Sequence, residues 1–166
     1  MIFRLIGALM IFAACTYTGM QKSGELKGRY SMLNAVSEAL GYLETEIEFA
    51  SNDLKKAFKS IDKNTKTHGL FADAAEKIEK LGIKRAWAYA VTKNTSFVSD
   101  TDRELLLMLG TKLGMTDTKN QLKHIGYVKE LITAQAAAAE NEYKRLGRIY
   151  RGGGVLTGLF IILVVM

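Results

Sequence analysis

The segment "LGTKLGMTDTKNQLKHI", residues 109–125, contains the residues whose types and spacing come nearest to a chemical site. Gly110, Lys112 and Gly114 stand beside threonines and Asp117, and a glycine-rich loop can surround a phosphate with backbone N–H groups. A phosphate loop, however, needs G-x-x-x-x-G-K-[ST] between a strand and a helix. The two glycines here are too close together and follow an apolar stretch with helical spacing. We therefore predict a joint between two helices.

The other reactive side chains are isolated in the sequence. His68 and His124 are 56 positions apart, and Cys15 is the single cysteine. We find no nucleophile with a base, and no carboxylate pair in a setting that would raise a pKa. The prediction is a protein that is not an enzyme, without catalytic residues, cofactor or metal ion.

Two uncharged stretches lie near the ends of the chain. Residues 5–21 and 152–166 contain 17 and 15 consecutive uncharged residues. As helices they would be roughly 25 and 22 Å long, close to the lower limit for a hydrocarbon core of about 30 Å. Arg4 and Arg151 can lengthen both by snorkelling. We predict a transmembrane segment over residues 1–21, a helical domain over 22–151 and a second transmembrane segment over 152–166.

Cys15 leaves a second interpretation of the first stretch open. A basic start and an apolar run also precede secretory cleavage sites. The sequence "FAAC" ending at Cys15 is close to the cleavage site of bacterial lipoproteins, although Phe12 stands where an aliphatic residue is usual. The distribution of charge favours a retained anchor, because seven basic residues flank the polar middle, against Arg4 outside it: Lys22, Lys27, Arg29, Lys144, Arg145, Arg148 and Arg151. By the positive-inside rule the middle faces the cytoplasm.

These flanking residues also explain the net charge of +6. They lie where anionic lipid headgroups would meet them. No nucleic-acid-binding motif with interleaved aromatic residues accompanies them. We therefore expect membrane lipid as a partner, and no nucleic acid.

Apolar residues recur at helical spacing through the middle of the chain, which contains no proline. In residues 30–49 the apolar stripe is Leu33, Val36, Leu40, Leu43 and Ile47, and Glu38, Glu44 and Glu48 lie off it. Four short helices are expected next. The first begins after the cap residues Ser51 and Asn52, and the second, around Phe71, ends at Gly82.

The third short helix contains Trp87, and the fourth begins at Ser99 with a capping box to Asp102 and ends at Gly114. The longest helix then begins at Asp117 or Thr118, with Gln121 reaching back to its cap. Its stripe extends over about 33 residues into the last uncharged stretch, with Lys129 in one slot: Leu122, Ile125, Ile132, Ala136, Ala139, Tyr143, Leu146 and Tyr150. The fold predicted is all-α, a six-helix bundle flanked by N- and C-terminal transmembrane helices.

Several motifs in a fixed order resemble the stage III sporulation protein AB family of endospore-forming bacteria. They are L-x-x-E-I, a turn and short helix, a tryptophan, and L-G-x-x-D-x-x-x-Q, between two apolar ends. The matching positions are Leu43, Glu46, Ile47, Trp87, Leu113, Gly114, Asp117 and Gln121. One departure is Asp53, where the family often has proline. The resemblance extends over nearly the whole chain.

The resemblance implies a function that composition alone does not. The family's soluble part is similar to the cytoplasmic domain of the inner-membrane platform protein of type II secretion and type IV pilus machines, which is a six-helix bundle. It implies a non-catalytic membrane platform in the mother-cell-to-forespore complex. The expected partners are the sporulation AA-type secretion ATPase and other stage III membrane proteins, and the expected location is the outer forespore membrane, with the domain in the mother-cell cytoplasm.

Some assignments stay open on the sequence. Glu38, Glu44 and Glu48 are candidates for a partner contact, against the alternative of a solvated helix face. Trp87 is either a core residue, which we favour, or an exposed anchor for a partner. Glu46 either pairs with a neighbouring cation or meets the ATPase. The second functional class is a generic membrane-tethered helical adaptor or lipoprotein unrelated to an ATPase.

Overall fold

The computed structural model describes residues 2–49, 53–115 and 117–165, which are all-α and contain no strand. The six helices are α1 (Ile2–Phe49), α2 (Leu54–Asn64), α3 (Leu70–Leu81), α4 (Ile83–Asn94), α5 (Asp100–Leu109) and α6 (Thr118–Val165). The predicted fold class and the number of helices are confirmed.

The helices form two compact units, and the two longest helices contribute to both. Unit 1 contains Met1–Tyr30 and Ala138–Met166, and unit 2 contains Ser31–Ala137. The sequence predicts continuity between bundle and anchor for α6 only, but α1 is also one helix of 48 residues. Gly24 and Gly28 weaken α1 by about 1 kcal/mol each at most.

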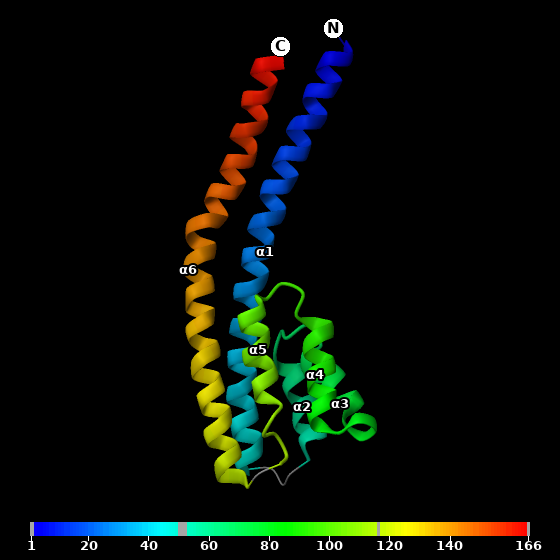
Figure 1. Cartoon of the computed structure of the whole chain (residues 1–166), viewed down its shortest axis with the longest axis vertical. Coiled ribbons are helices and arrows are strands. Elements are labelled where there is room, and N and C mark those ends of the chain that lie inside the picture. The colour runs from blue at the N-terminus through cyan, green and yellow to red at the C-terminus, as the bar shows by residue number, and fades with distance from the viewer. Residues whose placement is uncertain (1, 50–52, 116, 166) are drawn as a thin grey trace. The chain divides into compact units, whose positions relative to one another are not determined.

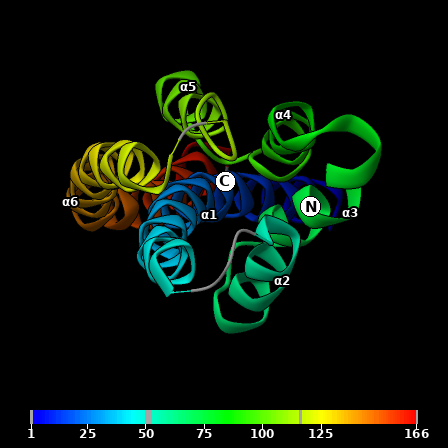
Figure 2. The same ribbon diagram turned by 90° about the horizontal axis from the view of Figure 1, so that it is seen from below.

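Aromatic and aliphatic side chains fill the core of unit 2, in which α1 lies between α6 and the group of α2, α3 and α4 (Figures 1 and 2). Trp87, Phe58 and Phe71 are fully buried, with ring centroids 5.2 to 5.7 Å apart. The indole N–H of Trp87 donates a 2.6 Å hydrogen bond to the carbonyl of Leu106. The prediction that Trp87 is a core residue is confirmed, and a role as an exposed anchor is ruled out.

The apolar stripes of α1 and α6 face this core over part of their predicted length. On α1, Ile47 is only half-buried at the last turn; on α6, Tyr143 is half-buried and Tyr150 is exposed. The stripe residues that are buried are Leu33, Val36, Leu40, Leu43, Ile125, Ile132, Ala136 and Ala139, together with Val128.

The ends of the short helices follow local capping rules. The predicted caps Ser51 and Asn52 lie outside the described residues, and Asp53 is the N-cap of α2, accepting a 3.2 Å bond from the Lys56 N–H. At this position, where the family often has proline, aspartate thus provides a hydrogen-bond acceptor that a proline side chain lacks. Gly82 ends α3 with φ of 73°, as predicted.

Candidate functional site

The joint, residues 109–121, connects α5 to α6 as predicted, but α5 ends earlier than predicted. Helix α5 ends at Leu109, so Gly114 lies in the turn that follows and not at the end of α5. Gly114 has φ of 69°, a conformation that L side chains rarely adopt. The Gly114 N–H donates to Gln121 Oε1 at 3.1 Å. The Gln121 side chain therefore reaches back to this turn.

Asp117 does cap α6. Its carboxylate accepts a 2.6 Å bond from the Asn120 side chain and a 3.2 Å bond from the Asn120 backbone N–H. These bonds hold the pKa of the Asp117 carboxyl below its usual range, the side-chain bond contributing most. Since α5 and not a strand precedes the joint, the geometry of a phosphate loop is absent from its described residues. The joint has a structural role.

The remaining motif positions also stabilise unit 2. Leu43, Trp87 and Leu113 are fully buried or nearly so. Glu46 is half-buried, and it forms no ion pair with any residue that the structure describes. Gly110 packs closely against Trp87, since a Cβ at Gly110 would lie 2.6 Å from the Cδ1 atom of the indole. Apart from Glu46, whose predicted contact with a partner stays a prediction, the motif therefore marks core and turn positions.

The three candidate contact glutamates of α1 differ in their surroundings. Glu38 and Glu48 are exposed, whereas the Glu44 side chain is 27% exposed and lies 2.6 Å from Lys129 Nζ. Lys129 occupies the charged slot in the α6 stripe, and Glu44 is its partner. Glu44 thus has a structural role that the sequence does not reveal, and Glu38 and Glu48 are the accessible members of the set.

Unit 1 consists of α1 up to Tyr30 and of α6 from Ala138 onwards, which lie side by side and antiparallel (Figure 1). Glycines let the two backbones approach closely. A Cβ at Gly19 would lie 2.4 Å from the carbonyl oxygen of Tyr150, and one at Gly154 would lie 2.7 Å from that of Cys15. Gly158 packs against Phe12 in the same way. No larger residue fits at Gly19 or Gly154 without moving backbone.

The large apolar side chains of unit 1 point outwards. Leu9, Tyr17, Leu156, Phe160 and Leu163 are each more than half exposed. Among the described helices, α6 is the one with a stretch apolar enough, by length and composition, to cross a membrane. Small residues at the contact and large ones outside are typical of helices that pack in lipid.

The contact between the two ends of the chain is not among the sequence predictions, although the sequence contains a signal for it. Gly154 and Gly158 are four residues apart in "GGGVLTGLF", the small-x-x-x-small spacing typical of close membrane helix pairs. The partner positions on α1, Cys15 and Gly19, have the same spacing. Such a motif does not identify its partner helix, so only the structure shows that the two ends pair with each other.

Comparison with known proteins gives one consistent result. The family model for stage III sporulation protein AB matches residues 4–166. Stage III sporulation protein AB of Bacillus subtilis (strain 168) is 28% identical over 169 residues, covering 98% of this chain and 99% of that protein. A solved structure of stage III sporulation protein AB matches with a TM-score of 0.63 and 26% identity, over 70% of this chain and 96% of the solved chain.

Proposed function

This chain belongs to the stage III sporulation protein AB family, and from that membership we propose that it is a non-catalytic platform subunit of a secretion-like complex. In this proposal both ends span the outer forespore membrane and unit 2 docks a cytoplasmic secretion-type ATPase in the mother cell. Other stage III membrane proteins of the complex would be its lateral partners. The observation that carries the proposal is the pairing of both apolar ends in unit 1.

The packing of unit 1 supports insertion of both ends as a helical hairpin. In water, exposing Leu9, Tyr17, Phe160 and Leu163 would be unfavourable, because each large apolar side chain contributes about 1.5–3 kcal/mol on burial. In lipid the same surface costs nothing, and the glycine contacts provide the van der Waals packing that holds membrane helices together. Cys15 lies inside this contact, which favours a retained N-terminal helix over cleavage there.

The charges beside the hairpin support a cytoplasmic position for unit 2. Seven basic residues follow the first apolar stretch or precede the second, and they exceed the three acidic ones, Glu25, Glu140 and Glu142. Basic residues near membrane spans remain on the cytoplasmic side. A cytoplasmic unit 2 is accessible to a cytoplasmic ATPase.

The polar groups of unit 2 support a binding role in preference to a catalytic one. Its buried carboxylate, Asp102, closes the α5 capping box with Ser99. The buried Gln121 holds the joint through Gly114. The buried Thr95 hydroxyl donates to the Val91 carbonyl. These groups are used for structure, and exposed residues such as Glu38 and Glu48 are left for contact with a partner.

Topology is tested with a cysteine introduced at the exposed Asn64 in a Cys15→Ala background. A membrane-impermeant thiol reagent should leave this cysteine unmodified in intact cells and label it after permeabilisation. The permeabilised sample is the control for reactivity. Efficient labelling in intact cells would place unit 2 outside the cytoplasm and exclude ATPase docking.

ATPase docking is tested by co-purifying the full chain with the ATPase at two salt concentrations. The double variant Glu38→Lys with Glu48→Lys should weaken binding most at low salt, because interfacial charge changes association and is screened by ions. Glu44 is left in place, since its replacement would also break the pair with Lys129. Glu104→Lys, an exposed reversal on α5, is the matched control.

The outcomes of this experiment distinguish a wrong contact surface, Glu38 and Glu48, from a wrong role, ATPase docking. Unchanged binding of the double variant would move the contact to another face of unit 2. Failure of the unmodified chain to bind any ATPase would favour the alternative of a membrane-tethered adaptor. Spore yield in cells with the double variant shows whether the contact matters for sporulation.

A further inference from the structure

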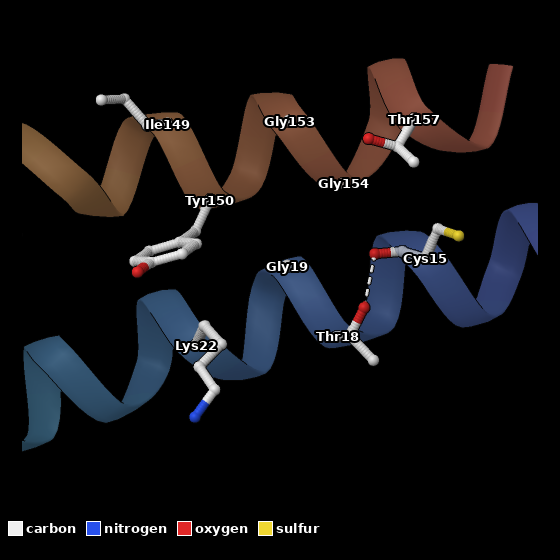
Figure 3. Close-up of a pocket in the computed structure, with 9 residues that line it drawn as sticks. All are labelled: Cys15, Thr18, Gly19, Lys22, Ile149, Tyr150, Gly153, Gly154 and Thr157. Atoms are coloured by element: carbon white, nitrogen blue, oxygen red, sulfur yellow. Dashed lines mark hydrogen bonds between the residues drawn. The ribbon is translucent and has the colours of Figure 1, made fainter. Parts of the chain in front are cut away.

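An open groove of about 350 Å³ runs between the two helices of unit 1 (Figure 3). Its α1 wall includes Cys15, Gly19 and Lys22, and its α6 wall includes Tyr150 and Gly153. The groove exists because glycine leaves no side chain to fill the space: a Cβ at Gly153 would meet no atom within 4 Å. This space lies on the surface of the helix pair and is open to its surroundings.

The two ends of the groove differ in chemistry. Lys22 and Tyr150 lie at one end, and Cys15 and Thr157 lie at the other (Figure 3). Lys22 is the first charged residue after the uncharged stretch of α1. Tyrosine is enriched at the boundary between lipid and water. If the hairpin spans the membrane, the Lys22 end lies at the cytoplasmic headgroups and the Cys15 end extends into the hydrocarbon.

The polar flank of unit 1 has more positive charge than its own carboxylates neutralise. Glu25, Glu142 and Glu140 pair with Lys22, Arg29 and Lys144 respectively. Four other cations of this flank form no ion pair with any described residue: Lys27, Arg145, Arg148 and Arg151. The Lys22 ammonium has three N–H donors and gives one to Glu25 at 2.8 Å. Donors are therefore available here for an anionic group.

From these features we propose that the groove binds one anionic membrane phospholipid. The headgroup phosphate accepts from Lys22 at the polar end, and an acyl chain lies along Gly19, Gly153 and Gly154. Basic pockets between membrane helices on the cytoplasmic side are known to recognise anionic lipid headgroups. This inference rests on the membrane hairpin of the proposed function. It adds a specific lipid site to that hairpin.

The test uses the full chain with Tyr150→Trp in lipid nanodiscs, because a tryptophan at this position reports on lipid in the groove. Brominated phosphatidylglycerol and brominated phosphatidylcholine are compared as quenchers at equal mole fraction. The natural Trp87 is buried in unit 2, and its emission is subtracted using the chain without Tyr150→Trp. We expect phosphatidylglycerol to be preferred about five-fold, the ratio that one basic contact near a membrane surface provides.

Two pairs of variants locate the preference. Lys22→Gln should bring the ratio close to one, whereas Lys27→Gln, which removes a charge of the same flank outside the groove, should preserve it. Gly153→Leu fills the groove and should also abolish the preference. Gly152→Leu is its matched control, because Gly152 has equally open space but does not line the groove.

Each outcome supports or overturns the proposal. The proposal is supported if the preference for phosphatidylglycerol is lost in Lys22→Gln and in Gly153→Leu but kept in their controls, Lys27→Gln and Gly152→Leu. A ratio near one for the starting Tyr150→Trp chain overturns it, and so does an equal loss in Lys27→Gln, which would indicate diffuse attraction. If neither brominated lipid quenches, the hairpin is not in the membrane, and the proposed function fails together with the site.

Discussion

The two units of this protein pack in opposite ways, although α1 and α6 contribute to both. Unit 2 buries Trp87, Phe58 and Phe71 together with most of its aliphatic stripe, although Phe49, Phe97 and Tyr127 are exposed. Unit 1 exposes leucines and aromatic residues and places glycines at the contact between its helices. The position of large and small side chains around a helix therefore changes within a single helix.

The proposed membrane position of unit 1 would account for this inversion. In water, apolar area is driven inwards, at about 25 cal/mol per Å². In lipid this drive is absent, and helices associate where small residues permit close contact. A packing pattern thus indicates the surroundings of a segment better than its mean hydropathy. Substitutions in one unit should therefore affect the stability of that unit and leave the other unit unchanged.

The largest expected effect is a charge in the core of unit 2. Ile132→Asp places a carboxylate on the fully buried face of α6, which costs several kcal/mol against a total stability of about 5–15 kcal/mol. Unit 2 should unfold or aggregate, as seen in the Trp87 emission of the full chain in detergent. Ala137→Asp, at an exposed position of the same helix, should melt like the parent. If Ile132→Asp melted like the parent, our assignment of the buried face would be wrong.

The next effect comes from the space beside Trp87. Gly110→Ala adds a methyl group 2.6 Å from the indole Cδ1 atom, and overpacking of this kind costs about 1–3 kcal/mol. Thermal melts should show the loss. Gly41→Ala is the control, because its methyl group would meet only the flexible end of Lys129, at 3.4 Å. A stable Gly110→Ala variant would show that the indole can move.

Damage to unit 1 should be smaller and should leave unit 2 intact. Gly154→Leu places a side chain against the Cys15 carbonyl, so the helices must separate and lose the close packing that small residues permit. Cys15 should then react faster with a membrane-permeant maleimide, while the Trp87 melt stays unchanged. Gly152→Leu should alter neither measurement. A shift of the Trp87 melt by Gly154→Leu would mean that the units are not independent.

The smallest effect is a pH dependence confined to unit 2. Burial raises the pKa of Asp73, but bonds from Lys93 at 2.8 Å and Asn94 at 2.7 Å outweigh it, so that pKa is lowered. A lowered pKa stabilises the fold above the ordinary value of about 3.9, and that stability is lost as the pH falls through the lowered value.

Asp73→Asn removes the charge of this carboxylate, and with it the pH-dependent part of the stability. It should lower stability by about 0.5–1 kcal/mol at pH 7, because the pair is partly exposed, and the difference from the parent should shrink towards pH 2. Melts at both pH values measure it, with Glu104→Gln as the control. A deficit that persisted at pH 2 would assign the effect to hydrogen-bond geometry and not to charge.

The predictions that the structure confirms depend on local patterns. The cap at Ser99, the helix end at Gly82 and the buried position of Trp87 each follow from residues within about one helical turn. The predicted end of α5 is wrong by about one turn, because Gly110 and Gly114 both satisfy a rule for helix ends. The fit against Trp87 of α4 is a further reason for glycine at position 110, and it depends on a second helix.

Contacts between distant residues account for the rest. Lys129 in an apolar stripe signals that a partner is needed, but its distance of 85 positions from Glu44 hides which carboxylate provides it. Likewise, the spacing of Gly154 and Gly158 signals a close neighbour without identifying α1. The accessible glutamates, Glu38 and Glu48, cannot be distinguished from the paired Glu44 until the position of α6 beside α1 is known.

The fit of Gly110 against Trp87 also restricts how this sequence can diverge. A side chain at position 110 crowds a bulky indole at position 87, so the two positions should tend to change together among relatives. The order of the two changes matters. Shortening Trp87 first opens a cavity and loses the hydrogen bond to Leu106, whereas enlarging Gly110 first causes the milder harm of crowding. Lineages that have lost the tryptophan should therefore more often have passed through an alanine at position 110.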